Sequence, residues 1–168
     1  MSAKRQRKQE RRARKRKVQQ ARQPSGQQIL LKRAQQSEYL QDAQILVNSG
    51  DIEKMSDVIL RFAEPILRGS QGVITKNAIR LAIGVWNVSF LPKDEQSEAL
   101  KPILNMLPED DQDTRRDLAA VIDMLLARKQ RYFAHNTRVI LDYQITESPD
   151  SLHLDVISTV AKEYRPPQ

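Results

Sequence analysis

The cations near the start of the chain give the clearest chemical signal. Eleven lysines and arginines lie between residues 4 and 22, with Glu10 as the one acid among them. Guanidinium and ammonium groups neutralise phosphates, and Arg-rich segments commonly fold when they bind RNA. We therefore expect this segment to contact nucleic acid, RNA in preference to DNA, through Lys4, Arg5, Arg7, Lys8, Arg11, Arg12, Arg14, Lys15, Arg16, Lys17 and Arg22.

A basic segment of this kind has other common uses. It can direct a protein to the nucleus of a eukaryotic cell or hold it at an anionic membrane surface. The membrane use is disfavoured because the segment lacks the Trp, Phe and Leu side chains that an interfacial helix buries. The alternative function is therefore a protein-binding adaptor whose basic tail is only a targeting signal.

A second polar group is expected near the C-terminus, where Asp142, His153 and Asp155 lie in two segments of alternating apolar and polar residues. In a hairpin with a four-residue loop at 147–150, Asp155 lies opposite Asp142 and His153 lies opposite Gln144. Two opposed carboxylates near an imidazole could bind a cation or share a proton, which is the basis of a third alternative, an enzyme. A solvated sheet face is the more ordinary interpretation, and we expect no metal site and no cofactor.

The remaining sequence contains little that suggests catalysis. It has no cysteine, only two histidines, and no P-loop, GxSxG, HExxH or dinucleotide-binding motif. The absence of cysteine excludes disulfides and zinc-thiolate sites, and nothing indicates an oxidising compartment. Aromatic residues make up 5% of the chain and no RNP or GXXG signature occurs, so sequence-specific base recognition is not predicted. We expect a non-enzymatic protein of the cytoplasm, or of the nucleus if the source is eukaryotic.

Charge divides the chain into two parts. Residues 1–33 carry 13 Lys and Arg against one acid, a net charge of +12, whereas residues 34–168 carry 15 against 20, a net charge of −5. Like charges four residues apart repel along a helix, and the basic part has no apolar stripe with which to dock. We expect residues 1–26 to form a flexible arm and residues 27–168 to form a single domain. The longest apolar stretch, Ile79 to Leu91, is too short to span a membrane.

Apolar spacing in the body predicts about five helices. Ser25 and Gln28 form a capping-box pattern that starts the first helix near residue 26, and Gly50 ends it. Pro65 is expected to kink or end the second helix. Asp51 and Thr75 are expected to cap the second and third helices, and the other two are expected from Pro92 to about Met106 and from Pro108 to Arg131.

The aromatic residues are expected to lie mostly in the core. Trp86 is on the most apolar helix and should be buried; if it were exposed, it would be the first candidate for a protein-binding hot spot. Tyr132 and Phe133 are expected to anchor the fifth helix to the C-terminal hairpin. His135 is expected to cap the end of that helix.

The apolar period changes from 3.6 to 2 after residue 138, which predicts a β-hairpin over about 138–160 with one apolar face packed on the helices. Pro149 disfavours a two-residue loop, because such loops need a positive φ. The expected pairs are therefore Ile145 with Leu152, Tyr143 with Leu154, and Leu141 with Val156.

Together these features predict a mainly α fold, a bundle or irregular array of about five helices with a C-terminal β-hairpin, behind a basic arm. The expected function is that of a non-catalytic accessory protein associated with RNA or a ribonucleoprotein. In this interpretation the arm contacts phosphates and the helical body contacts a protein partner.

Overall fold

The computed structural model describes residues 26–36, 53–105, 111–148 and 151–161. These residues form five helices followed by one antiparallel hairpin, so the mainly α fold with a C-terminal hairpin is confirmed. The elements are α2 (Gly26–Gln36), α3 (Met55–Leu67), α4 (Val73–Val88), α5 (Lys93–Leu104), α6 (Gln112–Tyr132), β1 (Arg138–Ser148) and β2 (Ser151–Val160).

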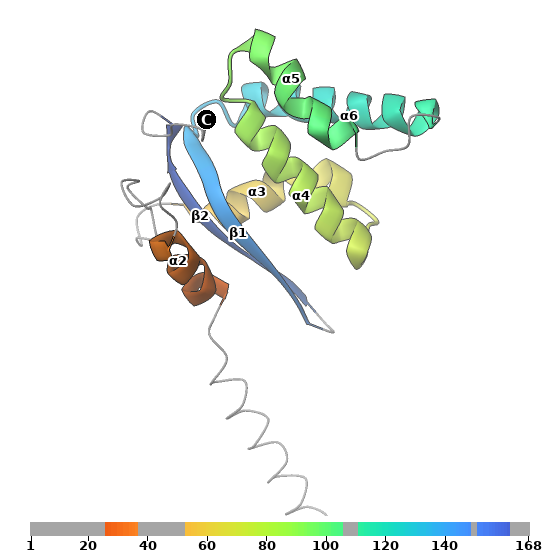
Figure 1. The fold of residues 1–168 in the computed structure, drawn as a ribbon. Coiled ribbons are helices and arrows are strands. Elements are labelled where there is room, and N and C mark those ends of the chain that lie inside the picture. Colours follow the sequence, from red (N-terminus) through yellow and green to blue (C-terminus); the bar gives the residue numbers. More distant parts are fainter. Residues whose placement is uncertain (1–25, 37–52, 106–110, 149–150, 162–168) are drawn as a thin grey trace, which may run out of the picture.

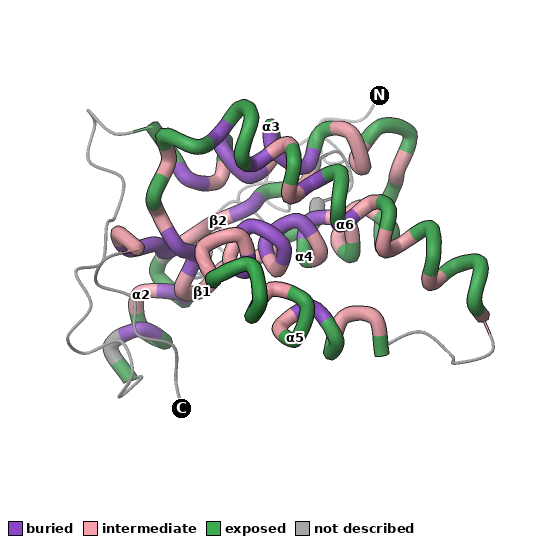
Figure 2. Tube along the Cα trace, turned by 90° about the horizontal axis from the view of Figure 1, so that it is seen from above, coloured by how far each residue is buried: buried purple, intermediate pink, exposed green. Residues whose placement is uncertain are grey.

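The hairpin lies between one helix and a group of four (Figure 1). The single helix, α2, contacts both strands, whereas α3 contacts β2 and α4 contacts β1 from the group of four. Helices α5 and α6 pack on α4, and α6 also packs on α3. In Figure 2 buried positions gather on α3, α4 and the strands, whereas the far part of α6 alternates between intermediate and exposed positions. The main core is therefore enclosed by α3, α4, the near part of α6 and one face of the hairpin.

The register of the hairpin differs from the predicted one by two residues. Ser148 pairs with Ser151, Ile145 with Leu154, and Tyr143 with Val156, so the predicted pairs and the four-residue loop at 147–150 are wrong. A slip of two residues leaves every side chain on its face of the sheet, so the apolar pattern cannot distinguish the two registers. The observed register extends the ladder by two pairs toward the loop, and residues 149–150 lie outside the described part of the chain.

A β-bulge at Leu141 makes both faces of the hairpin apolar, in contrast to the single apolar face expected. Ile140 pairs with Ser158 but Asp142 pairs with Ile157, so Leu141 is an extra residue in β1. The extra residue reverses the alternation. Ile140 therefore joins the main core, whereas Leu141 and Ile157 belong to a second, smaller cluster against α2.

Helix α4 supports the bulged strand through two neighbouring side chains. The indole Nε1 of Trp86 donates to the backbone oxygen of Arg138 at 2.8 Å. The amide of Asn87 donates to the oxygen of Ile140 at 2.8 Å and accepts from its nitrogen at 2.9 Å. An unpaired buried backbone group is costly. The side chains of Trp86 and Asn87 therefore satisfy backbone groups at the edge of β1 that a third strand would otherwise pair with.

An aromatic cluster joins α3, α4 and the end of α6. Trp86 is fully buried, as predicted, and meets Phe62 and Phe133 edge-on at ring-centroid distances of 5.2 and 5.9 Å. Phe133 thus anchors α6 to α3 and α4. Tyr132 does not anchor the helix as expected, because 55% of it is exposed. Neighbouring residues point in different directions at a helix end, so only one of the two aromatics reaches the core.

Helix ends match the predictions in part. Pro65 lies in the last turn of α3, which ends at Leu67, in agreement with the prediction. Helix α6 is capped by Asp111, which accepts from the backbone nitrogen of Thr114 at 3.1 Å and was not predicted as a cap. Helix α4 begins at Val73 after Gly72, which has a φ of 57°, so the Thr75 cap is wrong. The Thr75 hydroxyl instead lies 3.1 Å from that of Ser70. The caps predicted at Ser25 and Asp51, the first helix beyond Gln36, and Pro108 lie outside the described residues.

Lys129, and not His135, caps the end of α6. Its ammonium group donates to the backbone oxygens of Phe133 and Asn136, both at 3.1 Å. It also lies over the rings of Trp86 and Phe90, 4.5 and 4.7 Å from their centroids. Burial lowers the pKa of Lys129, while the two carbonyls, the ring faces and the negative end of the helix dipole favour its charged form. The contact holds the turn after α6 in place.

Candidate binding site

The predicted phosphate-binding residues, Lys4 to Arg22, lie outside the described residues. The described chain begins at Gly26 with α2. Leu30 and Ala34 of this helix are buried against Ile157, with Leu31 and Leu141 packed beside them. The basic N-terminal sequence therefore leads directly into a helix that is docked on the outer face of the hairpin.

Arg33 of α2 contacts polar groups of β1 on the face of the hairpin that α2 covers. Its Nε lies 3.3 Å from Oδ2 of Asp142, and its Nη2 donates to Oε1 of Gln144 at 3.0 Å and to the oxygen of Tyr143 at 3.5 Å. Asp142 also accepts from the nitrogen of Tyr143 at 2.8 Å. Asp142 is thus used to hold α2 on the hairpin.

The cross-strand pairing predicted for the polar cluster Asp142, His153 and Asp155 is wrong. Asp142 lies opposite Ile157, Asp155 opposite Gln144, and His153 opposite Thr146. His153 and Asp155 lie on one face of β2 and approach to 3.4 Å, whereas Asp142 pairs with Arg33. The described residues contain no group of three or more His, Cys, Asp or Glu side chains placed to hold a metal ion. The two-residue error in register accounts for the wrong pairing.

Trp86 does not meet the condition for a protein-binding hot spot, because it is fully buried. The large apolar side chains that are most exposed in the described part of the chain are elsewhere. Val73 and Ile74, in the first turn of α4, are 69% and 67% exposed, and Tyr132 is 55% exposed. Contacts with a partner would therefore involve these side chains and not the indole.

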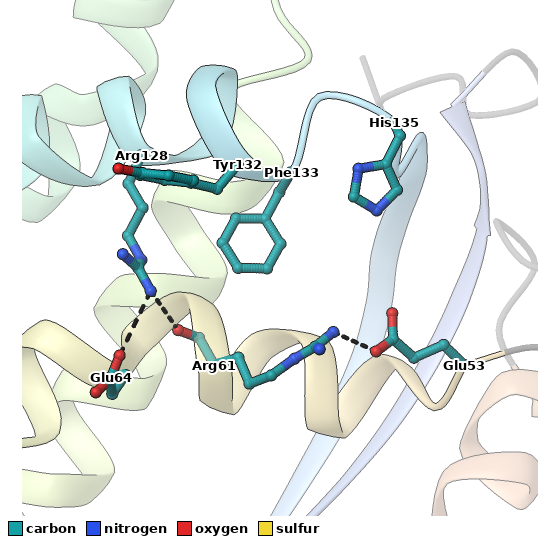
Figure 3. A pocket seen from close by; sticks show the side chains of 7 residues that line it. All are labelled: Glu53, Arg61, Glu64, Arg128, Tyr132, Phe133 and His135. Carbon is teal, nitrogen blue, oxygen red and sulfur yellow. Dashed lines mark hydrogen bonds and ion pairs between the residues drawn. The ribbon is translucent and has the colours of Figure 1, made fainter.

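A pocket of about 400 Å³ opens between α3, the end of α6 and the turn that follows it. Figure 3 shows Arg128 reaching from α6 toward α3, with Phe133 beside it and His135 at the opposite end. The seven lining residues are Glu53, Arg61, Glu64, Arg128, Tyr132, Phe133 and His135. We call this the α3–α6 pocket.

Arg128 is the most firmly held cation of the α3–α6 pocket. Its Nε donates to the backbone oxygen of Phe62 at 3.2 Å, and its Nη2 donates to that of Arg61 at 3.0 Å. Its guanidinium also lies over Tyr132, 5.5 Å from the ring centroid. Arg61 is held in turn by an ion pair with Glu53. Both guanidinium groups are therefore positioned before any ligand arrives.

Glu64 is held between two arginines at the edge of the pocket. Its Oε1 accepts from Nε and Nη2 of Arg68 at 3.2 and 2.6 Å, and its Oε2 lies 3.6 Å from Nη2 of Arg128. The hydrogen bonds and charge of Arg68, with a smaller contribution from Arg128, lower the pKa of Glu64 below its ordinary value of 4.5. The carboxylate therefore stays charged to a lower pH than an isolated glutamate.

This shift predicts a pH-dependent contribution to stability. A carboxyl group with a lowered pKa in the folded state stabilises that state at pH values above its unfolded pKa, and the contribution is lost as pH falls through the folded pKa. We expect the stability difference between the wild-type chain and E64Q to be constant at neutral pH and to shrink below about pH 4.5. Urea unfolding across a pH series measures it. Glu95→Gln, at an exposed position on α5, is the control, and a Glu64→Gln difference that is independent of pH would contradict the expectation.

Comparisons with protein-family models, with curated proteins and with solved structures find no match to this chain. Its function is therefore inferred from its own residues. The described helices include none that is both long enough and apolar enough to cross a bilayer.

Sequence reasoning missed the residues of the α3–α6 pocket. The signal that could have indicated them is the run Arg128 to Phe133, in which three cations and two aromatics follow one another at the end of a helix. Partners from α3 could not have been assigned to it, because Arg61 and Arg128 are 67 residues apart in the sequence.

Proposed function

We propose that this chain is a non-catalytic accessory protein associated with nucleic acid, RNA in preference to DNA, and that it works within a ribonucleoprotein in the cytoplasm or nucleus. The basic arm contacts phosphates and the helical body contacts a protein partner. The observation that carries the proposal is the division of charge, +12 over residues 1–33 against −5 over the rest. A polyanion is the partner that such a cationic segment attracts most strongly.

The docking of α2, the helix that follows the arm in the sequence, supports this division of roles. Leu30 and Ala34 bury one side of α2, and Arg33 pairs with Asp142, so residues immediately after the arm are committed to the fold. The exposed pair Val73 and Ile74 is the part of the body best suited to an apolar protein contact.

The alternative is an adaptor in which the basic tail only directs the protein to the nucleus or to an anionic surface. The two functions differ in what the arm binds. A targeting signal is recognised by a receptor protein, whereas a phosphate-binding arm releases counterions and makes affinity fall steeply with salt.

We expect the triple variant Arg11→Gln, Arg12→Gln, Arg14→Gln of the full chain to bind single-stranded RNA more weakly and with a shallower salt dependence. The slope of log K against log salt should fall by about 2, since each lost phosphate contact removes roughly 0.7 on a single strand. Fluorescence anisotropy with a labelled RNA ten nucleotides long, between 50 and 300 mM salt, measures the slope.

The matched control removes three exposed cations from the body: Lys54→Gln, Arg80→Gln, Lys93→Gln. Both variants have the same net charge, so only a local role of the arm separates them. Equal losses of RNA affinity in the two variants would mean that the overall charge, and not the arm, determines binding. If the arm variant binds RNA like the wild-type chain, the proposal is wrong and the adaptor function remains. Tighter binding of a DNA strand of the same length and sequence would reverse the preference for RNA.

A further inference from the structure

Around the α3–α6 pocket, cations outnumber acids. Arg61 and Arg128 line it, Arg68 and Arg131 stand beside it, and the carboxylates of Glu53 and Glu64 are already engaged in ion pairs with three of these arginines. A ligand entering the pocket therefore meets guanidinium groups whose positions are set but whose charge is only partly neutralised. An anion fits this environment better than a cation.

Several hydrogen-bond donors of the pocket remain open. Nη1 of Arg61, Nη1 of Arg128, the hydroxyl of Tyr132 and the ring of His135 have no hydrogen-bonding partner within the described residues. They come from α3, α6 and the following turn. In Figure 3 the guanidinium of Arg61 and the ring of His135 lie at the end of the pocket near Glu53, whereas Arg128 and Tyr132 lie at the other end, with Phe133 between them. Convergent donors from separate elements are the usual means of holding a phosphate.

The pocket also has an exposed aromatic ring. Tyr132 is 55% exposed, with Arg128 and Arg131 over its ring at 5.5 and 5.2 Å from the centroid. Exposed aromatic rings and guanidinium planes are the surfaces on which unpaired bases stack in complexes with single-stranded RNA. Arg131 is exposed and can move aside or take part in the stack. A volume of about 400 Å³ lies within the range of pockets that hold a small ligand.

We infer that the α3–α6 pocket binds one unpaired nucleotide of RNA, with its phosphate on Arg61 and His135 and its base against Tyr132 and Arg131. The inference rests on the proposed function and extends it, because it places a second nucleic-acid contact on the folded body. Oε1 of Glu53 pairs with Arg61, so its Oε2 is the carboxylate oxygen of the pocket available to a 2′-hydroxyl, the group that distinguishes RNA from DNA. Duplex RNA is excluded by geometry, because its bases are stacked and cannot enter the pocket.

The test uses the full chain and a labelled single strand of ten riboadenosines. Tyr132→Ala should weaken binding roughly 5- to 100-fold without changing the salt slope, because a stacking contact releases no counterion. Arg61→Gln should weaken binding and lower the salt slope by about 0.7, because it removes a phosphate contact. Tyr132→Leu keeps an apolar side chain but no aromatic face, and it should lose affinity like the alanine variant.

Two controls make the result specific to the pocket. Ile74→Ala and Arg80→Gln change an exposed apolar residue and an exposed cation of α4, and both should bind the riboadenosine strand like the wild-type chain. Thermal unfolding of each variant shows that the fold is retained. The NMR resonances of the His135 ring protons should shift when the single riboadenosine strand is added. They should not shift when the same strand is added paired with its complementary RNA.

The outcomes separate this inference from the proposed function. If the arm variant loses affinity while Tyr132→Ala and Arg61→Gln bind like the wild-type chain, the pocket does not hold a nucleotide and the arm alone binds RNA. If the wild-type chain binds no RNA, both proposals fail. Equal affinity for the deoxyadenosine strand overturns the assignment to RNA, and a His135 shift with the duplex overturns the requirement for an unpaired base.

Discussion

Replacing Trp86 with alanine is expected to lower the free energy of unfolding by about 5 kcal/mol, which is comparable to the whole stability of many small domains. The side chain is fully buried at the centre of the aromatic cluster. Its removal leaves a cavity, takes the donor away from the oxygen of Arg138, and removes one of the two ring faces beneath Lys129. Urea unfolding followed by circular dichroism measures the loss, since the chain has no other tryptophan to report by fluorescence.

A milder variant distinguishes these contributions. Trp86→Phe keeps an aromatic ring in the cluster but loses the indole N–H, so a loss of about 2 kcal/mol is expected. Val73→Ala, at a position that is 69% exposed, should change stability by less than about 0.5 kcal/mol. A Trp86→Ala variant that loses less than about 2 kcal/mol would mean that the cluster is loosely packed or open to water.

The positions of the helices could be predicted because apolar period and caps are local properties. The face of α6 that carries Ile122 and Leu125 follows from their spacing. The cap at Asp111 was not predicted, although its signal is also local, a short polar side chain ahead of an apolar run. Burial of Trp86 follows in the same way from its place on the most apolar helix. These features depend on residues within a few positions of each other.

The hairpin register and the α3–α6 pocket could not be predicted, because both depend on contacts between distant residues. The bulge at Leu141 is supported by Asn87, 53 residues before Ile140, and nothing in the strand itself marks it. The carboxylate of Asp142 is taken by Arg33, which lies more than a hundred residues earlier.

Asn87 is the most informative position for testing the fold, because it links α4 to the bulged strand. Asn87→Ala leaves both the backbone nitrogen and the backbone oxygen of Ile140 without their partner, and Ile140 is only 4% exposed. An unpaired buried backbone group costs about 1–3 kcal/mol, so we expect a loss of about 3 kcal/mol in the free energy of unfolding. Faster hydrogen exchange at the Ile140 amide should accompany it.

Asn87→Asp tests the hydrogen-bond pattern and not only the side-chain volume. The carboxylate still accepts from the nitrogen of Ile140, but it faces the oxygen at 2.8 Å without a proton to donate. Repulsion should raise the pKa of the new carboxyl group above its unfolded value, so the variant should regain stability relative to the wild-type chain as pH falls and the group becomes protonated. Asn77→Ala, at an exposed position on the same helix, should change stability by less than about 0.5 kcal/mol. If Asn87→Asp were as stable as the wild-type chain at neutral pH, water and not Asn87 would complete the edge of β1, and the bulge would need another explanation.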